Sequence, residues 1–199
     1  MMETVMRLAA DDVARSLRGS WHLMTRGAEA LPELDLTRDG FWRSFLAFAL
    51  MLPATVAILA AVRLVAGLPN SAGLFAAPTL ALSVIAAMAL TILAVPALLI
   101  VLRPELAQSP RFTSFVIAWN WAGIVSASLM AVPAAIFAIG WAPPKLAIVQ
   151  SLFFAAIVLR LRYCVARAVF GPVARGIALP LVTASLVLDY GVTRLFGLF

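Results

Sequence analysis

The chain has 199 residues, of which 64% are hydrophobic and only 12% are charged. Soluble globular proteins carry about 25% charged residues, so this composition excludes a water-soluble domain and predicts an all-α integral membrane protein. The formal net charge of +6 does not indicate nucleic acid as a partner, because basic residues in membrane proteins gather on the cytoplasmic side.

Residues 1–40 are predicted to form a cytoplasmic or interfacial segment. Apolar residues recur every three or four positions as far as Arg26, which predicts a helix with one apolar stripe. Two placements are open for this helix. It lies in the membrane interface, with Trp21 and Met24 at the acyl boundary, or it packs on the cytoplasmic face of the helix bundle. Residues 27–40 are predicted as a linker.

Residues 41–199 are predicted to form a five-helix transmembrane domain, since five apolar segments approach the length needed to cross a hydrocarbon core of about 30 Å. The predicted spans cover residues 44–62, 77–102, 112–139, 146–166 and 173–196. The fifth is the weakest, because its uncharged stretch from Ile177 to Leu188 needs its flanks in order to cross. Asp39 is predicted to cap the first span, and Trp42 and Trp141 are predicted to lie at the membrane interfaces.

The positions of the basic residues predict the orientation. With five spans and a cytoplasmic N-terminus, twelve of the fifteen Lys and Arg residues lie inside, and three lie outside, namely Arg63, Lys145 and Arg194. This asymmetry predicts an N-terminus inside and a C-terminus outside. Abundant Ala, Leu and Arg with a single Lys is typical of a GC-rich bacterial genome, so we expect the bacterial cytoplasmic (inner) membrane.

Groups that could carry chemistry are scarce. His22 and Cys164 are the only residues of their types, and the sequence contains no common metal-binding, nucleotide-binding or nucleophile motif. We therefore predict no catalytic residue, no cofactor and no metal site, and a protein that is not an enzyme.

The third span carries an unusual polar residue between two indoles, at Trp119, Asn120 and Trp121. Gly123 and Ala127 follow Asn120 on the same helical face, so a second helix can approach closely and bond to the amide. One interpretation is helix packing, within this chain or with a partner. The other is a pocket for a ligand or a lipid headgroup, lined by the two indoles and the amide.

Asp189 in the fifth span also allows two interpretations. A carboxylate within the membrane suits a proton or ion relay, since such groups are costly there and are usually functional. The sequence favours the alternative, in which Asp189 lies at the outer interface near Tyr190 and Arg194. A buried pair between Asp189 and Arg160 would need an offset between the fourth and fifth spans.

A charged amphipathic segment followed by five closely spaced spans resembles the Yip1 superfamily of multi-pass membrane proteins. Locally, the resemblance rests on Asp39-Gly40-Phe41-Trp42 at the entry of the first span and on Ala118-Trp119-Asn120-Trp121 in the third. The resemblance implies a non-enzymatic helical protein that acts through partners or lipids.

These observations favour a non-catalytic membrane scaffold or accessory subunit. Its expected partners are the lipid bilayer and either another membrane protein or a second copy of the chain. The first alternative is a component of a small-molecule or ion transporter. The second alternative is an intramembrane lipid-modifying enzyme.

Overall fold

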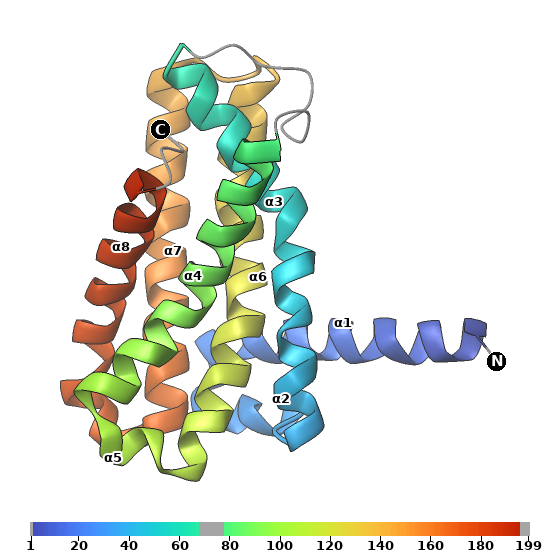
Figure 1. The fold of residues 1–199 in the computed structure, drawn as a ribbon, viewed down its shortest axis with the longest axis vertical. Coiled ribbons are helices and arrows are strands. Elements are labelled where there is room, and N and C mark those ends of the chain that lie inside the picture. Colours follow the sequence, from blue (N-terminus) through green and yellow to red (C-terminus); the bar gives the residue numbers. More distant parts are fainter. Residues whose placement is uncertain (1, 68–77, 196–199) are drawn as a thin grey trace.

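The computed structural model describes residues 2–67 and 78–195, and every regular element in these ranges is a helix (Figure 1). Ten helical elements follow one another: α1 (Met2–Arg26), η1 (Gly27–Glu33), α2 (Arg38–Ser44), α3 (Leu46–Val65), α4 (Pro78–Leu102), α5 (Pro104–Ala107), α6 (Pro110–Ala138), α7 (Pro144–Phe170), η2 (Gly171–Gly176) and α8 (Ala178–Leu195). The prediction of a helical protein is therefore confirmed for the described residues.

Four helical stretches in the described ranges are long and apolar enough to cross a membrane, namely Arg38–Val65, Thr79–Val101, Pro110–Ala138 and Pro144–Val173. A fifth apolar stretch, Ala178–Val192, is shorter. The length and apolar composition of these helices confirm the prediction of a multi-pass membrane protein. The fifth predicted span loses its first residues to the 3₁₀ turn η2, so that α8 has 18 residues and a length of about 27 Å.

Prolines set several helix boundaries. Pro104, Pro110 and Pro144 each occupy the first turn of a helix, where a missing backbone N–H removes no hydrogen bond. As a result, α6 and α7 each begin two residues before the predicted spans. Pro53 and Pro133 lie inside α3 and α6, as expected from their positions in the predicted spans.

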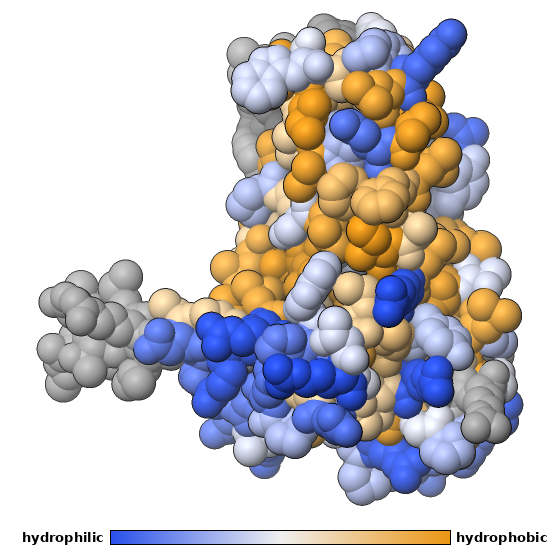
Figure 2. All heavy atoms as spheres, turned by 180° about the vertical axis from the view of Figure 1, so that it is seen from behind, coloured by the Kyte–Doolittle hydropathy of each residue, from blue (hydrophilic) through white to orange (hydrophobic). Residues whose placement is uncertain are grey.

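The N-terminal helix α1 runs across the bundle rather than along it (Figure 1). It packs on α6 and α7 through a narrow face on which Ser16, Ser20 and Leu23 are buried. Trp21 remains 39% exposed, and Met24 is partly buried against the same core. Figure 2 shows α1 at the boundary between a hydrophobic band and the hydrophilic end of the molecule. The helix thus packs on the bundle, because small residues on one face let it approach closely, and its placement in the membrane interface stays a prediction.

The helix α2 begins differently from the prediction. Thr37, not Asp39, is the N-cap, since its hydroxyl oxygen accepts a hydrogen bond from the Gly40 N–H at 3.1 Å. Asp39 lies in the first turn, where a negatively charged carboxylate interacts favourably with the helix dipole. Gly40 has no alternative here, because a Cβ atom would lie 2.0 Å from the carbonyl oxygen of Asp35.

Charged residues attach α1 to the chain that enters the first span. Arg43 bonds to Asp12 through Nη1 at 2.9 Å and to Asp35 through Nη2. The Thr37 hydroxyl donates to Asp35 and holds the pKa of that carboxyl below its ordinary value of 3.8. Partial burial opposes this shift, whereas the Thr37 N–H and the positive charge of Arg43 reinforce it.

Candidate functional site

Helix α6 is the centre of the bundle. It packs most extensively on α3 and α7 and also contacts α1 and α2. Its residues 115–122 are all buried, which is the pattern of a helix surrounded by others rather than one facing lipid. Trp119 and Trp121 are therefore core residues and not interfacial anchors. The polar Asn120 between them must find its partners inside the protein.

Asn120 is only 2% exposed and bonds across a helix contact. Its Nδ2 donates to the hydroxyl of Ser44, the last residue of α2, at 3.0 Å. That hydroxyl donates in turn to the carbonyl oxygen of Phe41 at 2.7 Å. The other amide atom, Oδ1, is buried without a hydrogen-bond partner among the described residues.

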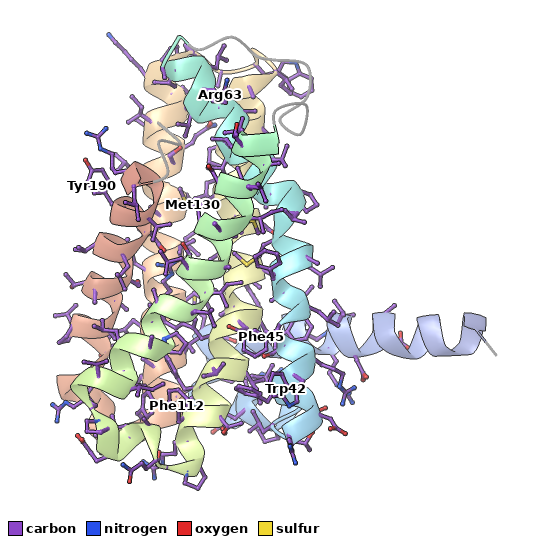
Figure 3. All side chains as sticks on the ribbon, in the orientation of Figure 1. Trp42, Phe45, Arg63, Phe112, Met130 and Tyr190 are labelled. Carbon is purple, nitrogen blue, oxygen red and sulfur yellow. The ribbon has the colours of Figure 1, made fainter. Side chains whose placement is uncertain are left out.

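The same helix lines a partly open cavity of about 270 Å³. Residues of α3, α4, α6, α7 and α8 contribute to its walls, which are mostly aliphatic. Asn120, Gly123 and Ala127, the face identified from the sequence, all line it. Gly123 faces α3 closely, because a Cβ atom at this position would make an ordinary contact with Met51 Sδ at 3.4 Å and would leave little room for a larger side chain. Figure 3 shows Met130, another lining residue, between the end marked by Arg63 and the end marked by Phe112.

The polar wall of this cavity is an ion pair. Arg162 on α7 donates from Nη1 to Asp189 Oδ2 at 2.7 Å and to the Ser185 hydroxyl at 2.9 Å, both on α8. Its guanidinium carbon lies 5.6 Å from the centre of the Trp119 ring, a cation–π contact. The side chains are 17% exposed for Arg162 and 33% for Asp189, so the pair is largely withdrawn from the surface.

The position of Asp189 differs from the interpretation that the sequence favoured. Its carboxylate turns toward Arg162 and the cavity, whereas Tyr190 points away from the bundle (Figure 3). Arg160, the partner considered from the sequence, is exposed. Arg162 lies two residues further along and therefore about 200° around α7, which brings it to the inner face.

The predicted interfacial residues fall in separate places. Trp42 lies near the Phe112 end of the bundle and is exposed (Figure 3). Trp141 follows the opposite end of α6 and is also exposed. Trp21 and Met24 lie on α1, as described above. The structure thus brings Trp119, Asn120 and Asp189, with the small residues of α6, to one cavity and leaves the interfacial tryptophans apart from it. Trp121 is buried but is not among the residues that line this cavity, so the predicted pocket of two indoles and an amide has only one of its indoles.

Sequence reasoning missed Arg162, Ser185, Ser44 and Ser126. Ser126 lines the cavity, is 4% exposed and has a hydroxyl without a described partner. A signal for Ser185 was present, because it precedes Asp189 by four residues and so shares its helical face. Within the described ranges, no group of three or more His, Cys, Asp or Glu side chains is placed to hold a metal ion.

Comparisons with protein-family models, with curated proteins and with solved structures found no match to this chain. A role for the chain must therefore be inferred from the cavity and its polar wall.

Proposed function

We propose that the chain is a non-catalytic binding component of a small-molecule transporter, and that the cavity between α4 and α6 holds the molecule. The ion pair of Arg162 and Asp189 on the cavity wall carries this proposal. Buried ion pairs add little net stability, since apolar residues of similar size often replace them without loss. Ionisable groups inside membrane domains are usually retained for binding or transport.

The packing of α4 supports a route into the cavity. Figure 1 shows α4 crossing the bundle obliquely. It packs mainly on α8 and only sparsely on α3 and α6, although Val84, Ala87, Met88, Thr91 and Ile92 of α4 line the cavity. Sparsely packed elements open at lower free-energy cost than the core. Movement of α4 would therefore admit or release a molecule while α3, α6 and α7 stay together.

The test uses small molecules that the protein retains. The full chain is purified in mild detergent, extracted, and its extract analysed by mass spectrometry. Ala127→Leu fills part of the cavity, and Ala156→Leu makes the same change at an exposed position of α7. We expect the wild type and Ala156→Leu to retain a molecule that Ala127→Leu loses. Equal retention by all three proteins would contradict a binding site in this cavity.

Flux provides the test of transport itself. We expect Asp189→Asn to abolish passage of the retained molecule across reconstituted vesicles, because the substitution removes the charge that Arg162 faces. The variant must still purify as the wild type does. Undiminished flux would contradict a role of the pair in transport.

A scaffold or accessory subunit is the second candidate, in line with the resemblance to the Yip1 superfamily. Two observations favour it: α1 extends beyond the bundle (Figure 1), and Trp21 is exposed although its neighbours Ser20 and Leu23 are buried against the bundle. The exposed face of α1 offers a contact for another membrane protein. This role predicts a fixed partner in a mild-detergent pull-down that Trp21→Ser weakens. Purification of the chain alone in a single monodisperse species would argue against it.

The proposed location is the bacterial cytoplasmic membrane, with the N-terminus inside and the C-terminus outside. Hydrophilic residues gather at the end of the bundle where α1 lies (Figure 2), and Arg63 marks the opposite end (Figure 3). This distribution suits the excess of basic residues expected inside. A reporter fused to the C-terminus should be active only outside the cytoplasm, and activity inside would contradict a full crossing by α8.

A further inference from the structure

We infer that the cavity selects a neutral amphiphile, with a small apolar body and one hydrogen-bond donor such as a hydroxyl group. The inference rests on the proposed function and names the class of molecule that the site takes. It excludes the corresponding carboxylate and ammonium compounds as preferred ligands.

The requirement for a donor follows from two unpaired atoms. Asn120 Oδ1 and the Ser126 hydroxyl are buried without partners among the described residues, and both residues line the cavity. They are 2% and 4% exposed, so bulk water does not satisfy them. Buried polar groups are almost always hydrogen-bonded, because an unpaired one is costly. The amide oxygen can only accept, so a ligand hydroxyl can donate to it. The Ser126 hydroxyl lies six residues further along α6, about 9 Å along the helix axis, and offers the ligand hydroxyl a second position.

The ion pair is the reason to expect a ligand without net charge. A carboxylate near Arg162 would also lie near Asp189, whose oxygen is 2.7 Å from the guanidinium nitrogen. An ammonium group near Asp189 would meet the positive charge of Arg162 in the same way. Because the two charges cancel and Trp119 covers part of the guanidinium, neither sign of ligand charge is favoured. A neutral group can approach without separating the pair.

The size and lining of the cavity limit the size and the apolar part of the ligand. Its volume of about 270 Å³ is at the low end of small-molecule sites, which span about 300–1,000 Å³. A whole phospholipid is therefore too large. Met51, Met88 and Met130 line the apolar part, and methionine side chains adapt to flexible alkyl chains.

The experiment compares four alkyl probes with the same photoreactive diazirine: decanol, decyl methyl ether, decanoate and decylamine. The full chain is reconstituted in lipid nanodiscs and irradiated with each probe, and labelled peptides are quantified by mass spectrometry. Labelling near Met88 and Met130 reports the cavity. Labelling near Leu152 and Phe153, which are exposed on α7, reports the lipid phase. The ratio of the two corrects for the partitioning of each probe into the bilayer.

We expect the ratio for decanol to exceed that for each other probe about tenfold, which corresponds to about 1.4 kcal/mol. Asn120→Leu should lower the decanol ratio toward that of the ether and leave the ether ratio unchanged, because the amide oxygen can bind only a donor. Ser126→Ala should lower both ratios, because the serine hydroxyl can also donate to an ether oxygen. Ser128→Ala, at an exposed position of the same helix, should change neither. If Asn120→Leu does not fold, Ser126→Ala alone decides the role of the unpaired atoms.

Three outcomes would overturn the inference while the proposed function stands. Equal cavity ratios for decanol and the ether would show that the unpaired atoms do not select the ligand. A higher ratio for decanoate or decylamine would show that one charge of the pair does select it. If the retained molecule is lost in Ala127→Leu but proves to be charged, the inference also fails alone. If no probe labels the cavity above the lipid face and no molecule is retained, the proposed function fails as well.

Discussion

The hydrogen bond between Asn120 and Ser44 predicts that a second substitution, Asn120→Leu, restores part of the stability that Ser44→Ala removes. Ser44→Ala removes the only described partner of a fully buried amide that already has one unpaired atom. Hydrogen bonds between membrane helices contribute about 0.6 kcal/mol on average and up to about 1.7, and leaving a buried donor unpaired costs about 1–3 kcal/mol. Since both groups here lie in the protein core, we expect a loss of about 1.5 kcal/mol in the free energy of unfolding.

Asn120→Leu should cost less than about 0.5 kcal/mol, although it changes the same contact. It removes the unpaired oxygen together with the donor, and the Ser44 hydroxyl keeps its bond to the carbonyl oxygen of Phe41. Introduced into Ser44→Ala, it should restore about 1 kcal/mol. The double variant would then be more stable than Ser44→Ala alone.

Unfolding by sodium dodecyl sulfate in mixed micelles, followed by helix content, measures all three variants. Ser128→Ala serves as a control, because the side chain is exposed and the change should stay within about 0.5 kcal/mol. A loss below 0.5 kcal/mol for Ser44→Ala would refute the reasoning. So would a double variant that is less stable than Ser44→Ala, because it would show that Asn120 contributes by a different contact.

Three further predictions concern the ion pair, the close helix contact and the N-terminal attachment. Asp189→Leu should cost about 2 kcal/mol in the same unfolding assay, and Arg162→Met added to it should recover part of the loss, because a lone charge in the cavity is worse than none. Gly123→Ala should be tolerated, whereas Gly123→Leu should lower the free energy of unfolding by about 1–3 kcal/mol through overpacking against α3. The lowered pKa of Asp35, caused first by the Thr37 hydroxyl, stabilises the fold above pH 3.8, and this contribution is lost as the pH falls through the lower folded-state value. Limited proteolysis of α1 should therefore speed up below that pH in the wild type and depend less on pH in Asp35→Asn.

Much of the fold was predictable because lipid restricts the backbone to few solutions. A long apolar segment must form a helix to satisfy its own peptide groups, so the spans follow from hydropathy alone. The boundaries were less certain where polar residues continue a helix, as α7 continues to Phe170. The fifth span was overextended, because hydropathy does not show that Gly171 to Gly176 form a separate 3₁₀ turn.

The site was predictable only in part. Asn120 stood out as a polar residue in an apolar span, and the structure places Ser44 and Met51 opposite the face that it shares with Gly123. The partner of Asp189 was not predictable, because it depends on the relative rotation and height of two helices. Hydropathy fixes neither of these quantities.

The ion pair also bears on how the chain enters the membrane. Arg162 and Asp189 belong to consecutive helices joined only by η2, so the two charges can enter as one hairpin. An Arg or Asp at the centre of an isolated helix opposes insertion by about 2.5–3.5 kcal/mol. Their pairing reduces that cost for both helices. The biogenesis of α8, the shortest apolar helix of the bundle, would then depend on α7 being present beside it in the insertion channel.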